Sequence, residues 1–418
     1  MCTAILQAIW RMNICILYEN KVTLVETYLT LKLESMKKLF LLVAAVCVTL
    51  GAAAQEALRS GSQIVSPEIH DNNSVTLRLF APEAKKVSVV GNFLTPDENP
   101  VEGTEMKRNS EGVWEYTSPV LRSELYNYNF VVDGVKICDP ANVYVCRDVA
   151  ATFNIFIING DRGELYRVND VPHGSVKRTW YNSPTLGKDR RITVYTPAGY
   201  EQSKEKYPVL YLLHGAGGDE EAWMTLGRTS QILDNLIAQG KAKPMLVVMT
   251  NGNAWQQAAP GEAADGMNQP AMRMAGARPQ ASFEQSFGDV IKFVESNYRV
   301  IAKKEARAVA GLSMGGGHSF NISRTYPNTF DYVGLFSAAA RMGDNEEVKE
   351  SLKKQRDNGF KLYWIACGKT DFLYDLNKEA MKYMDSINFP YTYRESGEGH
   401  IWRNWRIYLS EFAPMLFQ

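Results

Sequence analysis

The chain has 418 residues, with 46 lysines and arginines balanced by 46 aspartates and glutamates for a formal net charge of +0. The length predicts two or three domains, and a composition of 45% hydrophobic and 22% charged residues is typical of a folded soluble protein. The charge balance argues against a nucleic acid or an anionic membrane surface as a partner.

The N-terminal region carries the pattern of a secretion signal. The basic stretch Met36–Lys38 is followed by the apolar run Leu39–Leu50 and by an A-x-A cleavage pattern within Gly51–Gln55. The apolar run is too short to span a bilayer, so we expect no membrane insertion. We predict a signal peptide over residues 36–54, a secreted or periplasmic mature protein, and a mis-assigned translation start as the origin of residues 1–35.

Three cysteines remain after removal of this signal: Cys138, Cys146 and Cys367. An oxidising compartment permits a disulfide between Cys138 and Cys146, and two buried thiols are the alternative that the sequence leaves open. Cys367 falls in an apolar stretch and is expected in the core. No group of cysteines and histidines has the spacing of a zinc site. We expect neither a metal nor an organic cofactor.

Residues 60–162 have the pattern of an all-β domain. Five stretches rich in β-branched and aromatic residues are expected strands: Ser74–Phe80, Lys86–Val90, Val113–Thr117, Tyr126–Val132 and Phe153–Ile158. The dipeptide Asp133-Gly134 between two apolar runs predicts a hairpin turn. Short strands separated by turn signals at regular spacing predict a β-sandwich.

This segment resembles the immunoglobulin-like early-set domains that are grouped with family 48 carbohydrate-binding modules. The resemblance is carried by four stretches: Leu77–Pro82, Val87–Phe93, Gly112–Trp114 and Tyr128–Gly134. It implies a module that either binds glucan or only packs against a catalytic domain. Trp114, Tyr116 and Tyr126 are candidates for a sugar-stacking surface, with core packing as the alternative that we favour for Trp114.

A linker over residues 163–178 is expected to precede an α/β domain over residues 179–418. The expected strands are Arg191–Thr196, Val209–Leu213, Met245–Thr250, Arg307–Ala310, Tyr332–Phe336, Leu362–Cys367 and Pro390–Arg394. The expected helices are Thr229–Ala238, Phe283–Asn297, Gly315–Tyr326, Glu346–Gln355, Phe372–Ile387 and Ile401–Phe417. Their alternation predicts a mostly parallel, doubly wound sheet, in which ligands bind beyond the carboxyl ends of the strands.

The candidate nucleophile lies in the pentapeptide Gly311–Gly315, which reads G-x-S-x-G between a predicted strand and a predicted helix. This is the setting of a nucleophile elbow, a turn so sharp that a Cβ at either glycine would collide with neighbouring backbone. We predict that Ser313 is the nucleophile. A structural serine in a glycine-rich turn is the alternative.

A serine hydroxyl needs a base, which in this fold type follows the nucleophile and the acid in chain order. His400 lies in the glycine-rich loop between the last strand and the last helix, and we predict that it is the base. His318 follows Ser313 by five residues inside a helix, where we expect it to point away from the elbow.

The acid that orients the base should follow a strand between these two positions. Asp371 comes just after Leu362–Cys367, so we predict Asp371 as the acid. Asp375, inside a predicted helix, and Asp344, after an earlier strand, are the alternatives.

Two backbone N–H groups should bind the oxyanion of the reaction intermediate. We predict the N–H groups of Met314 and Ala216, with Gly215 as the alternative to Ala216. The loop that holds Ala216 lacks the spacing of a phosphate-binding loop. His214 in the same loop is expected to be a structural hydrogen-bonding residue.

Four stretches together resemble carbohydrate esterase family 1: Tyr211–Gly218, Val309–Gly316, Gly368–Asp371 and Gly399–Trp402. This α/β-hydrolase family includes feruloyl esterases, esterase D-like enzymes and mycobacterial mycolyltransferases. The resemblance spans about residues 175–418 and implies the same three catalytic roles for Ser313, Asp371 and His400.

An early-set domain ahead of such an esterase resembles secreted feruloyl esterases that act on plant cell-wall arabinoxylan. The resemblance implies a feruloylated or otherwise acylated plant polysaccharide or oligosaccharide as the substrate. An acetylxylan esterase is the nearest alternative, and a siderophore esterase or acyltransferase of the same fold is another. A glycan-binding protein with an inactive esterase domain is the alternative from a different functional class.

One departure from the family pattern is the long segment Asn251–Gln280, rich in alanine, glycine, methionine and proline. Loops of this length often act as lids or binding elements, so we expect this segment to contribute to acyl specificity. Trp223 and Trp255 lie near predicted loops and are candidates for stacking on an aromatic acyl group, with core packing as the alternative.

Overall fold

The computed structural model describes residues 64–94, 103–264, 280–342 and 345–418, with a few positions nearer the N-terminus. The predicted signal sequence Leu39–Leu50 and the alternative acid Asp344 lie outside the described residues. Contacts divide the chain into residues 1–63 and one compact unit over residues 64–418, which is described below. In the part of the chain that the structure describes, no helix is long and apolar enough to cross a membrane.

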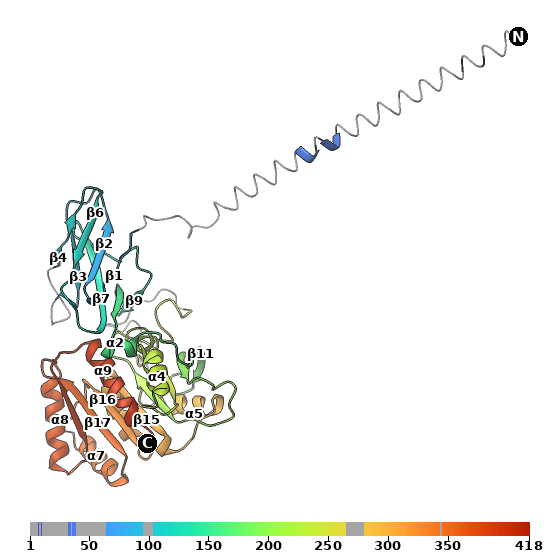
Figure 1. The fold of residues 1–418 in the computed structure, drawn as a ribbon. Helices are drawn as coiled ribbons and strands as arrows, with labels where there is room; N and C mark the ends of the chain where they lie inside the picture. The colour runs from blue at the N-terminus through green and yellow to red at the C-terminus, as the bar shows by residue number, and fades with distance from the viewer. Residues whose placement is uncertain are drawn as a thin grey trace. The chain divides into compact units, whose positions relative to one another are not determined.

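Residues 68–158 form a sandwich of two β-sheets (Figure 1). The first sheet has the order β1 (Glu68–Ile69), β2 (Val75–Phe80), β6 (Val113–Thr117) and β5 (Lys107–Arg108). The second has the order β4 (Thr104–Glu105), β3 (Val87–Gly91), β7 (Glu124–Val132), β10 (Ala151–Ile158) and β9 (Val145–Asp148), with β8 (Val135–Ile137) paired to β7. Asp133 and Gly134 connect β7 to β8 with positive φ angles of 47° and 89°, which confirms the predicted hairpin.

The sandwich core contains the aromatic residues that were candidates for a sugar-stacking surface. Trp114 is 6% exposed and donates its indole N–H to the carbonyl oxygen of Ala81 at 2.9 Å. Tyr126 is 3% exposed, and Tyr116 packs half-buried against the same cluster. A stacking role is therefore wrong for Trp114 and Tyr126, because their rings fill the space between the two sheets.

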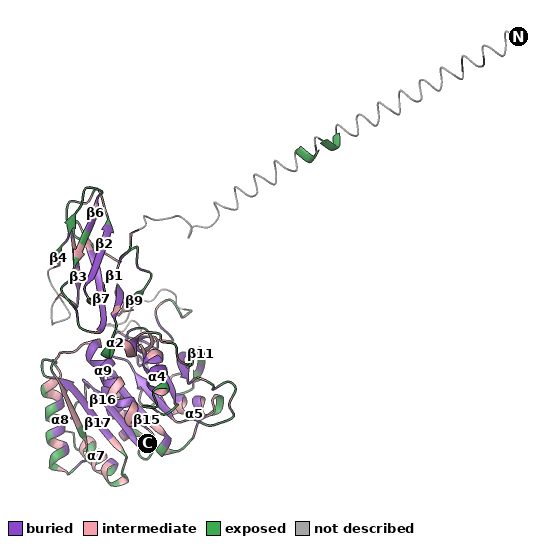
Figure 2. Cartoon of the chain, viewed as in Figure 1, coloured by how far each residue is buried: buried purple, intermediate pink, exposed green. Residues whose placement is uncertain are grey.

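The second half of the unit is built on an eight-stranded sheet. Its order is β11 (Ser175–Ser183), β12 (Lys188–Thr196), β14 (Leu246–Thr250), β13 (Val209–Leu213), β15 (Arg307–Leu312), β16 (Tyr332–Phe336), β17 (Leu362–Gly368) and β18 (Thr392–Ser396). The first two pairings are antiparallel, and all pairings from β14 to β18 are parallel. Figure 2 shows the central strands buried, as expected for a parallel sheet covered on both faces. This arrangement confirms the predicted doubly wound α/β-hydrolase fold.

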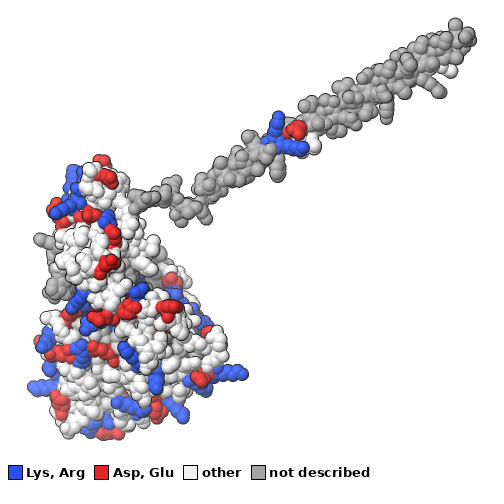
Figure 3. Space-filling model, in the orientation of Figure 1, with Lys and Arg blue, Asp and Glu red and all other residues white. Residues whose placement is uncertain are grey.

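Helices cover both faces of this sheet. One face packs against α5 (Phe287–Asn297), α6 (Met314–Thr325), α7 (Glu346–Asn358) and α8 (Tyr374–Ser386). The other packs against α4 (Thr229–Ala238) and α9 (Trp402–Phe412). The strand β13 shows why the chain folds this way, since Tyr211 faces one core and Leu212 the other. Outside these cores, Lys, Arg, Asp and Glu are interspersed on the visible face, in keeping with the balanced charge (Figure 3).

The segment predicted as a linker contains structure at both ends. The short helix α2 (Asp161–Tyr166) ends inside it, and β11 begins at Ser175, so the predicted boundary at residue 179 falls within a strand. The strand β11 pairs with β12 over nine residues at the edge of the sheet. The sequence favoured a linker because Pro172 and Gly174 lie in this stretch, and β11 begins directly after Gly174.

Cys138, Cys146 and Cys367 are free thiols, so Cys138 and Cys146 form no disulfide in this structure. Cys146 is buried where the sandwich meets the α/β domain, and burial raises the pKa of its thiol. Cys367 is fully buried in β17, which confirms its expected place in the core.

The two domains share a core and a buried ion pair. Leu125 of β7 and Ile155 of β10 pack in the same cluster as α4 and α9. Arg406 of α9 lies 3.2 Å from Oε1 of Glu124, and the two side chains are 2% and 1% exposed. Arg406 also donates to the carbonyl oxygens of Leu125 and Leu226 at 3.3 and 3.1 Å. The sandwich is thus fixed to the α/β domain by contacts that exclude water.

Removing one partner of this buried pair should destabilise the whole unit. In Arg406→Met the Glu124 carboxylate stays buried without its cation, at an expected cost of about 3–5 kcal/mol in the free energy of unfolding. Urea unfolding measures this cost. Lys353→Met is the matched control, because Lys353 pairs with Glu350 on an exposed helix face and should unfold near the wild-type midpoint. An Arg406→Met variant that unfolds at the wild-type midpoint would contradict the assignment.

Candidate active site

Ser313 occupies a sharp turn between β15 and α6, in the backbone conformation φ 53°, ψ −115°. Such a conformation is rare for a residue with a Cβ and costs about 1–3 kcal/mol. A Cβ on Gly311 would lie 2.5 Å from the carbonyl carbon of Gly315, and one on Gly315 would lie 2.5 Å from the carbonyl oxygen of His214. Only glycine fits at these two positions, as expected for a nucleophile elbow.

Neighbouring strands hold this turn in place. The N–H of Ser313 donates to the carbonyl oxygen of Phe336 at 2.8 Å, and the carbonyl oxygen of Ser313 accepts from the N–H of Ala339 at 2.9 Å. Phe336 ends β16, the strand next to β15. The strained conformation of Ser313 is therefore maintained by the sheet around it.

Asp371 and His400 form a hydrogen-bonded pair. The Nδ1 atom of His400 lies 3.0 and 2.9 Å from the two carboxylate oxygens of Asp371. Burial favours the neutral acid, but the hydrogen bonds that the carboxylate accepts, first that of His400 and then that of the Leu373 N–H, together hold the pKa of Asp371 below its ordinary value. An ionised Asp371 keeps the proton of the neutral imidazole on Nδ1, so that Nε2 is free to accept one. Asp375, the alternative acid, lies in the first turn of α8.

The sheet topology explains how distant residues meet. Ser313 follows β15, Asp371 follows β17 and His400 follows β18. The strands β15 to β18 are parallel neighbours, so their carboxyl ends share one edge of the sheet. The chain order and the strand order together gather the three predicted catalytic residues at that edge.

The predicted oxyanion loop runs beside Ser313. A Cβ on Gly215 would lie 2.5 Å from Cδ1 of Leu312 and 3.4 Å from the Cβ of Ser313. No described residue accepts a hydrogen bond from the N–H of Ala216 or of Met314, the first residue of α6. Both N–H groups predicted from the sequence are thus free to donate. That of Met314 is one of the N–H groups at a helix N-terminus that have no partner within the helix.

His214 ties this loop to its neighbour. Its Nδ1 lies 2.7 Å from the carbonyl oxygen of Gly215, and its Nε2 accepts from the N–H of Gly252 at 2.7 Å. Burial lowers the pKa of His214 to about 4, so its imidazole is neutral near pH 7. His214 is a structural hydrogen-bonding residue, as expected from the sequence.

Two buried side chains without a role predicted from the sequence, those of Arg190 and Glu220, support the loop after β14. Arg190 is fully buried and donates to the carbonyl oxygens of Asn251 and Asn253 at 2.5 and 2.9 Å. Glu220 accepts from Nδ2 of Asn251 at 3.2 Å and from the N–H of Ala259 at 2.9 Å. One of these two side chains could have been noticed in the sequence, because Arg190 is a charged residue directly beside an apolar strand pattern.

The predicted binding segment Asn251–Gln280 is described only in part, since residues 265–279 lie outside the described residues. Trp255 within it is half-buried, and its indole N–H is buried without a partner among the described residues. Stacking of Trp255 on an acyl group remains a prediction.

Trp223 lies in the core and not at the substrate site. It is 1% exposed, and its indole N–H donates to the carbonyl oxygen of Leu213 at 2.9 Å. Its ring packs edge-to-face against Trp402, with centroids 5.4 Å apart. Stacking on a substrate is therefore wrong for Trp223, because the short helix α3 (Ala222–Thr225) turns this side chain inward.

His318 is engaged elsewhere. Its Nδ1 lies 2.7 Å from Oε1 of Glu284, and its ring packs against Phe283. Burial opposes the charge on Glu284, but the interactions with His318 and the other hydrogen bonds to this carboxyl together lower its pKa to about 2. No group of three histidine, cysteine, aspartate or glutamate side chains within the described ranges could hold a metal ion.

The β-sandwich holds the loop that carries His400. Arg122 of the sandwich forms an ion pair with Glu398, which Arg403 of α9 also contacts at 3.1 Å. On the other side of His400, the indole N–H of Trp402 donates to Oδ2 of Asp148 at 3.2 Å, and Asp148 ends β9. This loop is thus held two residues before and two residues after His400. No sequence pattern indicates the Arg122–Glu398 and Trp402–Asp148 contacts, which join residues more than 250 positions apart.

Two family models match the chain. Residues 183–413 match the model described as "Putative esterase", and residues 60–144 match carbohydrate-binding module 48 (isoamylase N-terminal domain). Both resemblances stated from the sequence are confirmed by these matches.

Several known proteins are similar. An endo-1,4-beta-xylanase/feruloyl esterase of Xylanibacter ruminicola is 30% identical over 361 residues, which cover 84% of this chain and 46% of that protein. The chain spans about half the length of the curated relatives it matches. The enterobactin esterase of Shigella flexneri has a TM-score of 0.55 at 16% identity, covering 82% of this chain and 92% of that one. A feruloyl esterase module of Clostridium thermocellum has a TM-score of 0.50 at 20% identity, covering 61% and 92%. The two solved structures show the fold alone.

Acid should weaken the fold through His214. The pKa of His214 is lowered to about 4 from 6.5, so the unfolded chain binds this proton first as the pH falls. The stability contributed by neutral His214 is complete above about pH 6.5 and is lost toward pH 4, by up to about 3 kcal/mol. His214→Gln, which does not titrate, should lose less stability across this window in urea unfolding. Equal losses in the variant and the wild type would contradict this role.

Asp148 should act as a positioning residue for His400. Asp148→Ala removes the acceptor of the Trp402 N–H, and we expect kcat on a small ester to fall on the order of tenfold, with KM and melting temperature near the wild type. Asp148→Asn keeps an acceptor oxygen and should retain most activity. Glu111→Ala, an exposed sandwich carboxylate, is the control. Equal kcat values in Asp148→Ala and the wild type would exclude this role.

Proposed function

We propose that this chain, which belongs to the esterase family, is a secreted feruloyl esterase that releases hydroxycinnamic acids from plant cell-wall arabinoxylan. One observation carries the proposal: a serine on a strained elbow shares a sheet edge with a buried aspartate–histidine pair. This arrangement supports ester hydrolysis by a serine esterase. The name of the Xylanibacter relative and the match to a carbohydrate-binding module support the choice of a feruloylated polysaccharide as substrate.

In the first half of the reaction, Ser313 Oγ attacks the ester carbonyl and gives its proton to Nε2 of His400. The N–H groups of Met314 and Ala216 bind the oxyanion that develops. Collapse of this intermediate breaks the bond to the sugar oxygen, which takes the proton from His400 and leaves. The acyl group stays on Ser313.

In the second half, His400 takes a proton from a water molecule, which attacks the acyl-enzyme. The second intermediate collapses to a free hydroxycinnamic acid, and the proton on His400 returns to Ser313 Oγ. Asp371 keeps the imidazole oriented and stabilises its charged form in both halves without taking the proton.

The secreted location rests on the signal pattern over residues 36–54. A mature protein whose N-terminus is at or near Gln55 is the expected result of N-terminal sequencing. A secreted product that retains Met1 would contradict it.

The catalytic assignment is tested with an ester panel on the purified full chain. We expect Ser313→Ala and His400→Ala to lower kcat by about 10⁴-fold or more, and Asp371→Asn by about 10⁴-fold. Ferulate released from methyl ferulate and from bran arabinoxylan is measured by chromatography. Full activity in Ser313→Ala would end the mechanism.

Two other outcomes would replace the substrate or the class of function. Acetate released from acetylated xylan without any ferulate would make the protein an acetylxylan esterase. A wild-type chain that a fluorophosphonate probe does not label at Ser313 would indicate a glycan-binding protein with an inactive esterase domain.

A further inference from the structure

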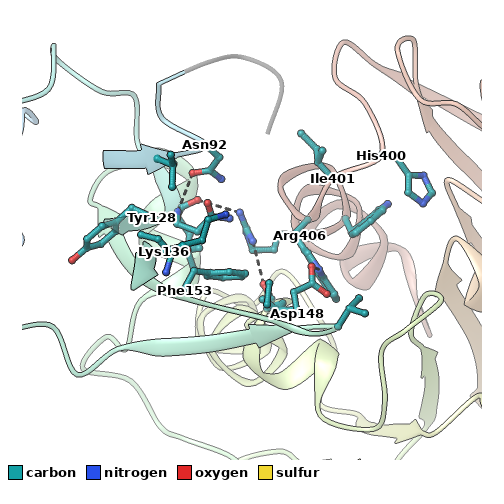
Figure 4. A pocket seen from close by; sticks show the side chains of 18 residues that line it. Asn92, Tyr128, Lys136, Asp148, Phe153, His400, Ile401 and Arg406 are labelled. Carbon is teal, nitrogen blue, oxygen red and sulfur yellow. Dashed lines mark hydrogen bonds between the residues drawn. The ribbon is translucent and has the colours of Figure 1, made fainter. Parts of the chain in front are cut away.

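The imidazole of His400 touches two aromatic rings. Its ring centroid lies 4.4 Å from that of Phe372, and the two ring planes make an angle of 50°. Trp405 of α9 packs edge-to-face against the same imidazole, with centroids 5.0 Å apart and ring planes at 85°. Figure 4 shows Asn92 of the sandwich on the other side of Ile401 from His400. These two ring contacts of His400 thus come from its own domain.

Phe372 is a large apolar side chain that no core holds. It is 75% exposed, whereas Trp405 is 6% exposed. It belongs to none of the hydrophobic clusters that the described residues form. Apolar side chains stabilise a fold through the area that they remove from water, so this ring adds little to the free energy of unfolding. Phe372 can therefore be replaced without loss of the fold.

The turn that carries Asp371 also sets the position of Phe372. Oδ1 of Asp371 accepts from the N–H of Leu373 at 2.8 Å, and the carbonyl oxygen of Asp371 accepts from the N–H of Tyr374 at 2.9 Å. Bonds of this kind fix a turn, and Phe372 lies inside it. The helix α8 begins directly after the turn, at Tyr374. One rigid turn thus presents two neighbouring side chains to His400, a carboxylate at Nδ1 and a phenyl ring against the imidazole.

The loop of His400 packs directly on the backbone that leads into this turn. A Cβ on Gly368 would collide with the carbonyl oxygen of Glu398, so only glycine lets the two backbones pass this closely. Farther along, a Cβ on Gly399 would lie 3.4 Å from Oγ1 of Thr370. Because the two segments are in contact, Phe372 and His400 keep their relative position.

The hydrogen bond with Asp371 holds the imidazole at one atom only. Hydrogen bonds to carboxylate oxygens tolerate a broad range of directions, so the ring can tilt about Nδ1 and stay bonded. A tilt displaces Nε2, the atom that receives the proton of Ser313 in the proposed mechanism. A displacement of about 1 Å can lower a rate on the order of 100-fold. Keeping Nε2 in place therefore requires contacts along the ring as well as at Nδ1.

Resting on the proposed role of His400 as the base, we infer that Phe372 is a positioning residue for its imidazole. Phe372 and Trp405 occupy space that the ring would need in order to tilt or rotate, so Nε2 stays directed at Ser313. The exposure of Phe372 is compatible with this role, because the contact with the imidazole is what positions Nε2 and burial is not required.

The kinetic test uses Phe372→Ala and Phe372→Tyr in the full-length chain, with methyl ferulate as the substrate. Phe372→Ala should lower kcat about tenfold and leave KM near the wild-type value, because the substrate still binds while proton transfer is slower. Phe372→Tyr keeps a ring of the same shape and should retain most of the kcat. Phe80→Ala is the matched control, since Phe80 is 51% exposed on β2 of the sandwich, and it should keep the wild-type kcat.

A second ester distinguishes positioning of the base from contact with the substrate. The ester 4-nitrophenyl acetate has a small acyl group and needs the same base, so Phe372→Ala should lower its kcat by a similar factor. A loss confined to methyl ferulate, or a raised KM with an unchanged kcat, would make Phe372 a substrate contact and overturn the inference. A wild-type kcat on both esters would also overturn it.

Histidine NMR observes the ring without turnover. The chain has five histidines, so isotope-labelled histidine gives few ring signals, and the signal of His400 is the one lost in His400→Gln. We expect one narrow His400 signal in the wild type, a broadened or doubled signal in Phe372→Ala, and a narrow signal again in Phe372→Tyr. A single narrow His400 signal in Phe372→Ala would mean that the imidazole is held without Phe372, which is the opposite of the inference.

Failure of the proposed activity is a separate outcome. If the wild type hydrolyses neither ester, the esterase proposal falls. The NMR comparison still decides in that case whether Phe372 holds the imidazole of His400.

Discussion

The hydrogen bond between Asp371 and Nδ1 of His400 determines what the rest of this site can do. It decides which imidazole nitrogen can accept a proton and where that nitrogen lies. The bond requires a buried carboxylate that stays charged, and the imidazole supplies part of the stabilisation that burial removes, alongside the N–H of Leu373. The strained turn, the parallel sheet and the neutral His214 position Ser313 and the loop beside it. This arrangement supports proton transfer only if the imidazole of His400 keeps one orientation.

The loop of His400, the predicted base, is held largely from outside its own domain. Arg122 contacts the loop before His400, and Asp148 contacts the residue that begins α9 after it. Farther along α9, Arg406 is buried against Glu124 of the sandwich. One helix of the α/β domain thus follows the loop of His400 and forms the domain interface along its length. The position of His400 therefore depends on how the sandwich packs against the α/β domain.

Local signals predicted the parts of the site that depend on local geometry. The glycines around Ser313 follow from the sharpness of one turn, and the places of Asp371 and His400 follow from strand order, so spacing was enough to find them. The contacts of Arg122 and Asp148 depend on how two domains pack, which no spacing encodes. Trp223 was misjudged because its loop forms a short inward-turning helix, and β11 was missed because Pro172 and Gly174 directly ahead of it indicated a linker.

The buried pair of Arg406 and Glu124 also bears on how this chain can be divided. The predicted start of the α/β domain at residue 179 is an obvious place to truncate the chain. A fragment that begins there would lack the first part of the edge strand β11. It would also expose the hydrophobic surface that Leu125 and Ile155 cover. The guanidinium of Arg406 would remain on this surface without the carboxylate of Glu124. A fusion protein that uses this esterase therefore needs the β-sandwich and the α/β domain together.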